Sequence, residues 1–383
     1  MADLSAALLL IAAWAYVIGV TAAAWQFARR RIVAAEDGSA FAPPISVLKP
    51  LSGAEPGLAD NLRSFADQDY PEFQLVLGIR DRSDAALPIA RALIAERPDC
   101  DIVLVIDPRT EGSNLKVANL ENMLPSARHK VIVVADSDMR VTPDYLRIVV
   151  APLADPATGL VTCLYKGVPT PGVWSTLAAL HINFGFLPGA LAGAALDIGG
   201  GCFGATLALR RRVLERIGGF ARLRNELADD HRMGSAVRRL GLATVLSPYI
   251  VENRVAEPSL ESLWLHELRW ARTSRAMAPV GFAGWAISHT VVLSVLAAAV
   301  IGLRPVAACA LVLLSVLLRW ASASAMARWF DLPLRGLWLL PLRDALSFAV
   351  FVASFCGRSV LWRNHQFQVD PSGRMQVGGD KPV

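Results

Sequence analysis

Cysteine is scarce in this 383-residue chain, and the spacing of the five that occur argues against a disulfide framework or a structural zinc site. A reducing compartment is consistent with this usage. Interleaved basic and aromatic residues are also absent, which argues against nucleic acid as a partner in spite of a net charge of +5. No internal repeat or low-complexity tract is evident, so nothing favours a repeat architecture.

Charge is missing from the start of the chain. Residues 4–27 carry no charged side chain, and Arg29, Arg30 and Arg31 follow them. As a helix, this run is long enough to cross the hydrocarbon core of a bilayer, which is about 30 Å thick. No small-residue cleavage site follows, and the basic residues come after the apolar run rather than before it. The pattern predicts an uncleaved anchor with a cytoplasmic C-terminal flank, in preference to a cleaved signal peptide.

Between a small-residue linker at 38–44 and Trp270, short apolar runs alternate with helical patterns. Strands that alternate with helices are typical of an α/β fold with a parallel sheet and crossover helices. The predicted strands are residues 45–49, 73–79, 101–106, 130–135, 159–164, 205–209 and 243–246. Predicted helices at about 57–67, 83–97 and 113–124 connect the first four of them.

Long apolar runs return after Trp270. Residues 287–303 and 306–318 predict a hairpin of two spanning helices, and residues 345–360 either span or re-enter. An arginine-rich segment between these runs predicts a loop on the inner side of the membrane, and its members are Arg319, Arg328, Arg335 and Arg343. Residues 174–198 are also apolar and predict either a buried helix or a helix that lies along the membrane.

Acidic residues follow two of the predicted strands. Asp81 comes after one strand, and Asp136 and Asp138 come directly after another. Ligands of open parallel sheets bind at the carboxyl ends of the strands. There Asp81 is able to accept the imide N–H of a uracil, although a turn aspartate that bonds its own backbone is the simpler interpretation. Two carboxylates two residues apart are able to hold one Mg²⁺ or Mn²⁺ together with substrate phosphates.

Two further polar groups stand where helical patterns begin. Lys116 is placed to pair with a phosphate near a helix start, or else is simply solvated. Asp229 and Asp230 open another helical pattern. Because adjacent residues on a helix start point in different directions, we expect one of them to cap the helix. The other would act as a general base that takes a proton from an acceptor hydroxyl.

His266, Arg269 and Trp270 lie on a helical pattern at about residues 260–277. The guanidinium of Arg269 offers a planar fork of donors that suits a diphosphate. Trp270 offers a flat face to an acceptor or a sugar. The alternative is a juxtamembrane helix whose Arg meets lipid headgroups and whose Trp lies at the interface.

The order of these residues resembles the D, D(x)D, D, (Q/R)xxRW signature of the ceramide glucosyltransferase family. Its members here are Asp81, Asp136 with Asp138, Asp230, and Arg269 with Trp270. Neighbouring motifs match as well, namely Lys49-Pro50-Leu51, Gly112-x-Asn114-x-Lys116 and Trp362-Arg363. One position departs from the signature, because His266 stands where the family has Gln or Arg.

The resemblance implies a GT-A type fold, a UDP-sugar donor, a divalent cation (Mg or Mn) and inversion at the anomeric carbon. It assigns Asp81 to the uridine, Asp136 and Asp138 to the metal and diphosphate, and Asp230 to the base. Arg269 and Trp270 form the end of the last motif. His266 and Lys116 complete the expected nucleotide-sugar site.

The implied organisation is a membrane anchor at 1–31, a cytoplasmic GT-A domain at 43–280, C-terminal membrane segments at 281–363 and a polar tail at 364–383. The implied function is transfer of one glucose or N-acetylglucosamine to a lipid hydroxyl, as in ceramide, at the inner (cytoplasmic) membrane. A hopanoid acceptor such as bacteriohopanetetrol is the alternative. A processive polysaccharide synthase would need more spanning helices. A transporter would place ionisable residues inside its membrane segments.

Overall fold

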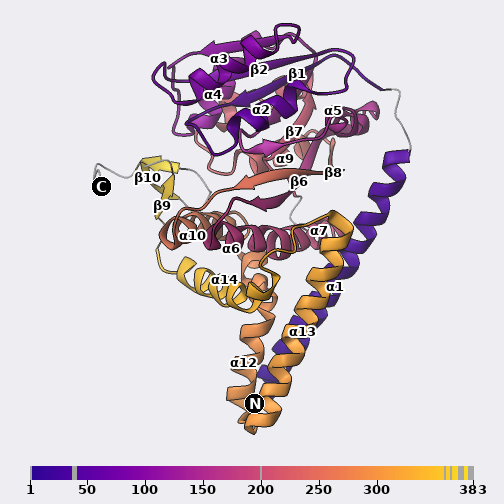
Figure 1. The fold of residues 1–383 in the computed structure, drawn as a ribbon, viewed down its shortest axis with the longest axis vertical. Coiled ribbons are helices and arrows are strands. Elements are labelled where there is room, and N and C mark those ends of the chain that lie inside the picture. The colour runs from indigo at the N-terminus through magenta and orange to yellow at the C-terminus, as the bar shows by residue number, and fades with distance from the viewer. Residues whose placement is uncertain are drawn as a thin grey trace.

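The computed structural model describes residues 2–36, 41–198, 201–357, 359–362, 365–369 and 375–377. An α/β body occupies one end of the molecule, and long apolar helices extend from its opposite side (Figure 1). Between these two parts lies a layer of helices that run crosswise (Figure 1). The N-terminus lies at the far tip of the long helices (Figure 1).

The α/β body is built on an eight-stranded sheet with the order β3-β2-β1-β4-β7-β6-β8-β5. Its strands are β1 (Ile45–Pro50), β2 (Phe73–Ile79), β3 (Ile102–Ile106), β4 (Val131–Ala135), β5 (Met139–Arg140), β6 (Thr158–Pro169), β7 (Thr206–Arg210) and β8 (Ala243–Val255). Strands β3, β2, β1 and β4 are parallel, as the sequence predicts. Strand β7 is antiparallel to both β4 and β6, so the sheet is mixed and the expectation of a purely parallel sheet is wrong. The reason is the apolar segment between β6 and β7, which returns the chain to the sheet at the end where β6 left it.

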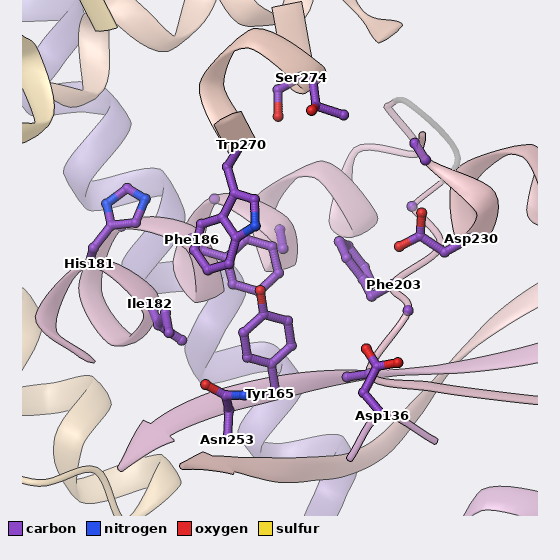
Figure 2. A pocket seen from close by; sticks show the side chains of 18 of the residues that line it. Asp136, Tyr165, His181, Ile182, Phe186, Phe203, Asp230, Asn253, Trp270 and Ser274 are labelled. Atoms are coloured by element: carbon purple, nitrogen blue, oxygen red, sulfur yellow. The ribbon is translucent and has the colours of Figure 1, made fainter. Parts of the chain in front are cut away.

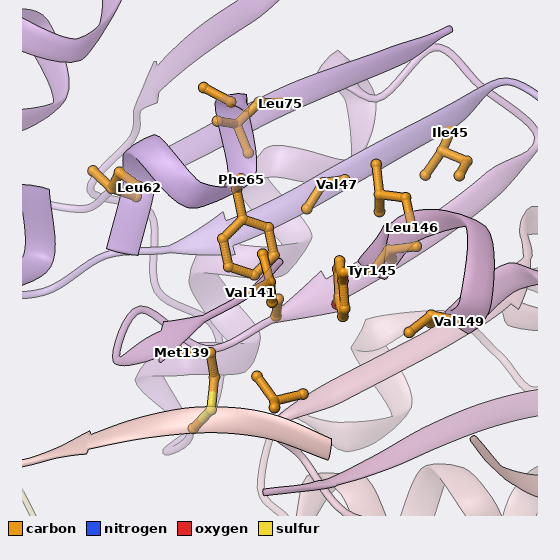
Figure 3. Packing of buried hydrophobic residues seen from close by; sticks show 14 of the residues in the cluster. Ile45, Val47, Leu62, Phe65, Leu75, Met139, Val141, Tyr145, Leu146 and Val149 are labelled. Atoms are coloured by element: carbon orange, nitrogen blue, oxygen red, sulfur yellow. The ribbon is translucent and has the colours of Figure 1, made fainter. Parts of the chain in front are cut away.

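Alternating side chains of these strands build a core on each face of the sheet. On one face, Val47 and Leu75 pack with Phe65 and Tyr145 (Figure 3). That face is covered by α2 (Leu58–Ala66), α3 (Ala86–Glu96) and α5 (Tyr145–Val150). On the other face, strand residues such as Leu48 meet α4 (Leu115–Met123), α8 (Arg211–Arg216) and α9 (Asp229–Arg239). Because both faces are covered, the loops at the strand ends are the part of the sheet left to bind a ligand.

The remaining helices are apolar or border the apolar part. They are α1 (Ala2–Glu36), α6 (Val173–His181), α7 (Leu187–Ala195), α10 (Leu260–Met277), α11 (Pro279–Gly284), α12 (Thr290–Ile301), α13 (Pro305–Phe330) and α14 (Leu340–Ser354). A π-helical turn, Ile182–Phe186, joins α6 to α7. Helices α1, α12 and α13 run side by side away from the sheet, whereas α6, α7, α10 and α14 form the crosswise layer (Figure 1). A three-stranded sheet of β9 (Ser359–Trp362), β10 (His365–Val369) and β11 (Met375–Val377) follows.

Within the described residues, four helices are long and apolar enough to cross a membrane: Ala2–Arg31, Val173–Ala195, Pro305–Phe330 and Leu337–Ser354. The count rises to five if the pair Pro279–Ser288 and Thr290–Ile301, bent by 73°, is a single span. Hydroxyl contacts fasten α1 to α13, with Thr21 Oγ1 2.6 Å from Ser322 Oγ and the Trp14 indole N–H donating to Ser315 Oγ. The predicted anchor is therefore a helix packed against the C-terminal apolar helices.

The predicted arginine loop is wrong for most of its members. Arg319 and Arg328 lie inside α13, which continues twelve residues past the predicted end at 318, and Arg343 lies inside α14. Arg319 donates from Nη2 to Asp344 Oδ1 at 2.8 Å and from Nε to Asp344 Oδ2 at 3.0 Å, and both side chains are buried. Since this pairing compensates the charge, the helix tolerates an arginine that the apolar pattern counted as a boundary. Arg319 and Arg343 thus lie within the apolar helices as partners in buried pairs, whereas Arg328 is exposed.

Candidate active site

One cavity of about 2040 Å³ lies between the ends of the strands and the crosswise helices. All eight residues singled out from the sequence line it: Asp81, Lys116, Asp136, Asp138, Asp230, His266, Arg269 and Trp270. Figure 2 shows Asp136 and Asp230 on one side of this space, with Trp270 above and the ring of Tyr165 between them. The structure therefore brings into one pocket residues that the sequence places up to 189 positions apart.

The segment Asp136-Ser137-Asp138 turns sharply after β4, and its side chains have different partners. Asp136 Oδ1 lies 2.6 Å from Lys116 Nζ. Asp138 Oδ2 accepts a hydrogen bond of 2.7 Å from Asn253 Nδ2, while Ser137 Oγ donates to Glu55 Oε2 at 2.7 Å. Burial, together with the nearby charges of Asp136 and Glu55, raises the pKa of Asp138 to about 7. The acidic side chains at this turn thus carry more negative charge than the neighbouring lysine side chains compensate.

The buried side chain of Lys49 holds this turn in place. Its ammonium donates a 2.7 Å hydrogen bond to the backbone carbonyl of Asp136 and lies 3.6 Å from the centre of the Phe65 ring. The side chain is fully buried, and this burial lowers the pKa of Lys49 to about 7. Lys49 thus positions the acidic turn without lining the cavity, whereas the next residue of β1, Pro50, does line it.

The acidic turn has the chemistry that a hard divalent cation requires. Asp136 and Asp138 offer only oxygen donors, and Mg²⁺ typically binds one or two carboxylates together with substrate phosphates. No group of three or more His, Cys, Asp and Glu side chains with metal-site geometry occurs in the described part of the chain. A cation held here would therefore need a ligand such as a diphosphate to complete its coordination. The excess negative charge around Asp138 favours the binding of such a cation.

Lys116 stands between the acidic turn and α9. Asn114 caps α4 by accepting hydrogen bonds from the backbone N–H groups of Lys116 and Val117, as expected for a helix start. The Lys116 ammonium contacts Asp136 and lies 3.9 Å from Asp229 Oδ2. Burial alone would lower the pKa of Lys116, but the charges of Asp136 and Asp229 outweigh it and raise this pKa. Lys116 is therefore held in its cationic form at the centre of the acids.

Both acids at the start of α9 line the cavity. The expectation that one of them caps the helix is wrong, because Ala228 is the N-cap residue and no side chain makes a capping hydrogen bond. Asp229 approaches Lys116, whereas Asp230 lies on the side of Gly204. An added Cβ on Gly204 would stand only 3.1 Å from Asp230 Oδ2, so the glycine makes room for this carboxylate. Asp230 Oδ1 accepts a 2.7 Å hydrogen bond from the backbone N–H of His231. Burial and the neighbouring Asp229 raise the pKa of Asp230 to about 6.

Asp81 lies at the rim of the cavity after β2. Its Oδ1 accepts a 2.8 Å hydrogen bond from the backbone N–H of Ser83, and hydrogen bonds from Ser83 lower the pKa of Asp81. This contact is the turn interaction that the simpler interpretation predicts. The side chain is also exposed toward the cavity, so the local turn and a binding role are compatible.

A carboxylate that the motif analysis did not single out fixes His266. Glu257 lies in the connection between β8 and α10, and its Oε1 is 2.7 Å from His266 Nδ1. Ser262 Oγ donates to Glu257 Oε2 at 2.6 Å. Burial would raise the pKa of Glu257, but hydrogen bonds from His266 and Ser262 outweigh it and lower this pKa. The His266 ring in turn stands edge-on to Trp270 with the ring centres 4.3 Å apart.

Helix α10 carries the Arg-Trp motif, and a buried ion pair joins this helix to α14. Glu267 accepts two hydrogen bonds, of 2.7 and 2.6 Å, from Arg343 of α14, and both side chains are buried. Arg269 and Trp270, on the same helix, line the cavity. The bidentate pair thus sets the position of the Arg-Trp motif relative to the apolar helices.

Comparison with known proteins identifies the family. The family described as glycosyl transferase family 21 matches residues 9–375. The chain belongs to this family. Together with the curated relatives described next, this match confirms the predicted relationship to ceramide glucosyltransferases, and the structure has the predicted α/β fold flanked by apolar helices.

Curated relatives of this family-21 chain include two ceramide glucosyltransferases of Caenorhabditis elegans. Ceramide glucosyltransferase 1 is 24% identical over 239 residues, which cover 62% of this chain and 51% of the relative. Ceramide glucosyltransferase 3 is 23% identical over 265 residues, covering 69% and 57% respectively. The chain thus spans about half the length of the curated relatives it matches.

Solved structures resemble this family-21 chain only distantly. A mannosyltransferase from Pyrobaculum calidifontis in complex with GDP-Man and Mn²⁺ is 18% identical, covers 91% of this chain and 99% of its own, and has a TM-score of 0.49. Glucosyl-3-phosphoglycerate synthase from Mycobacterium tuberculosis with Mn²⁺ and UDP is 18% identical, with coverages of 62% and 81% and a TM-score of 0.39. These similarities are too low to place a ligand in the present cavity.

Proposed function

We propose that this protein is an inverting glycosyltransferase that moves one sugar, glucose or N-acetylglucosamine, from a UDP-sugar to a hydroxyl of a membrane lipid such as ceramide. One observation carries the proposal. A single cavity is lined both by the acidic groups Asp136 and Asp230 and by residues of the apolar helices α1 and α7. A polar donor and a lipid acceptor therefore have access to the same space.

The donor would occupy the acidic end. Asp81 would accept the uracil imide N–H, and Lys116 and Arg269 would face the diphosphate. Asp136 and Asp138 would hold Mg²⁺ or Mn²⁺, which when bound neutralises charge on the diphosphate leaving group. Lys116 already balances Asp136 in the described structure, so a donor would find a cation in place at the acids.

Asp230 would serve as the general base. A carboxylate whose pKa is about 6 is ionised at neutral pH, yet it is a better proton acceptor than an ordinary aspartate. It would take the proton of the lipid hydroxyl while the oxygen attacks the anomeric carbon opposite the departing diphosphate. Attack from that side inverts the configuration, and holding both substrates in one cavity supplies the required orientation.

The acceptor's polar end would contact the aromatic side of the cavity. Trp270 offers an apolar face there, and His266, which Glu257 holds beside it, would face the UDP-sugar. We assign the boundaries 1–31, 43–280, 281–363 and 364–383 to anchor, catalytic domain, membrane segments and tail, with the catalytic domain on the cytoplasmic side of the inner membrane.

Four or five candidate spans in the described chain are few for the polymer channel of a processive synthase.

The test is a transfer assay with the purified protein. Radiolabelled UDP-glucose and UDP-N-acetylglucosamine are each incubated with ceramide and with bacteriohopanetetrol, and the lipid phase is analysed. We expect a monoglycosylated lipid from at least one pair, no product after chelation, and recovery on adding Mn²⁺ or Mg²⁺. Labelled polymer, or no lipid product from any pair, would contradict the proposal. Full activity in excess chelator would remove the metal from it.

A further inference from the structure

The cavity extends beyond the acidic residues to a part that we call the membrane arm. The arm is lined by small side chains of two helices, namely Ala15, Gly19 and Ala23 of α1 and Gly189 and Gly193 of α7. Both helices belong to segments that are long and apolar enough to cross a membrane. The arm is therefore the part of the active-site cavity that lies along candidate membrane-spanning segments.

Two glycines shape this arm in different ways. A Cβ added to Gly19 would meet no atom within 4 Å, so this face of α1 borders open space. A Cβ added to Gly189 would stand 3.3 Å from the hydroxyl of Tyr16, so Gly189 lets α1 and α7 approach closely. The open space beside Gly19 is thus part of the cavity, and it stays unfilled because residue 19 has no side chain.

Another face of α1 has the opposite character. Ile11 and Ile18 are 58% and 60% exposed and do not line the cavity, as expected for side chains that meet lipid tails. Helix α1 thus presents these large apolar residues outward, whereas Ala15, Gly19 and Ala23 leave room in the arm. Bulky residues on both faces of α1 would fill the arm. The backbone polar groups of a helix bond within the helix, so they need no hydrogen-bond partner in the arm.

We propose that the membrane arm holds the hydrocarbon tail of the acceptor and that Gly19 sets the size of tail that the enzyme accepts. The inference rests on the proposed function and deepens it. A hydrocarbon chain is the occupant because the arm is continuous with the catalytic acids and most of its lining side chains from α1 and α7 are apolar. Tyr16 and Gln26 are the exceptions, so a polar molecule would find few hydrogen-bond partners there. The tail moves from one apolar medium to another, so the arm selects by shape and adds little affinity.

The test compares two ceramides that differ only in the acyl chain, with six and with sixteen carbons. We expect Gly19→Trp to lower kcat/KM at least about tenfold for the long chain and clearly less for the short one, with Gly19→Leu between wild type and Gly19→Trp. Ile11→Trp is the matched control, because it places the same tryptophan side chain at an exposed position of the same helix that does not line the cavity. It should change neither value. Equal loss for both chains, or no loss for either, would overturn the inference.

A second readout does not depend on transfer. A long-chain ceramide with a diazirine at the end of its tail should crosslink to residues 15–26 in wild type and in Ile11→Trp, and weakly in Gly19→Trp. Crosslinks that are absent there, or equal in all three, contradict the inference even if no sugar is transferred. If the wild type glycosylates no lipid but crosslinks as expected, the proposed function fails and the tail site stands.

Discussion

Asp230 is the residue whose environment makes the clearest prediction. Burial, with Asp229 beside it, raises its pKa to about 6, and a base must be ionised to accept a proton. We therefore expect kcat/KM to fall below pH 6, by about tenfold per unit once the carboxylate is mostly protonated. A pH–rate profile at saturating metal measures this limb. Activity that stays constant down to pH 5 would contradict the assignment, and Asp230→Glu, if active, should keep the limb.

Glu257 gives a second prediction at the residue scale. Its carboxylate orients His266 through the 2.7 Å contact to Nδ1, so Glu257→Gln should misplace the ring. We expect KM for the UDP-sugar to rise about tenfold with a smaller change in kcat, since loss of one charged hydrogen bond costs about 1.5–3 kcal/mol. In a His266→Gln background the same change should have little further effect. Additive losses in the two backgrounds would show that Glu257 acts independently of His266.

Sequence order, together with the family signature, was enough to nominate eight of the residues that line the cavity. Asp136 and Asp138 follow a strand and Asp230 begins a helix, so their positions were readable from local patterns. Glu257 and Glu55 were not, because each is placed by a contact with a distant side chain or turn. The prediction that Asp229 or Asp230 caps the helix failed for a related reason. The partner of Asp229, Lys116, lies on another helix, and this pairing orients the Asp229 side chain toward the cavity.

At the scale of elements, the buried pair between α10 and α14 should control both stability and catalysis. Arg343→Leu leaves the Glu267 charge buried without its partner, which typically costs about 3–5 kcal/mol. We expect a lower melting temperature in detergent and reduced transfer, because α10 carries Arg269 and Trp270. The double variant with Glu267→Leu should recover most of the stability. If Arg343→Leu melts like wild type, the pair does not fasten α10.

Element boundaries show where local patterns stop being informative. Helix α13 continues past Arg319 because Asp344 compensates its charge, which an apolar count is unable to see. Strands β6 and β8 extend to Pro169 and Val255, well past their predicted ends, because they pair with each other over a long parallel ladder. Prolines and charged residues interrupt the apolar pattern of both strands, and the ladder shifts its register around Pro248 before it resumes at Ile250.

At the scale of the whole molecule, the cavity depends on segments that are far apart in the chain. Helix α1 packs against α7, α12 and α13, and its Gly19 borders the same space as Asp230. An apolar run near the N-terminus predicts a membrane helix but says nothing about which other helix it meets. The family signature, by contrast, fixed the convergence of the acidic residues in advance. What the sequence left open is the apolar side of the cavity.

The central claim is that a sugar is transferred within this cavity with Asp230 as the base. The most direct test measures transfer and UDP-sugar binding together in purified Asp230→Asn, with melting temperature at pH 8 as the control for folding. Since an ionised buried carboxylate opposes folding above its pKa, the variant should melt no lower than wild type. We predict that it binds the UDP-sugar with near wild-type affinity and transfers at least about a hundredfold more slowly. Near wild-type transfer by a folded, donor-binding Asp230→Asn protein would contradict the account.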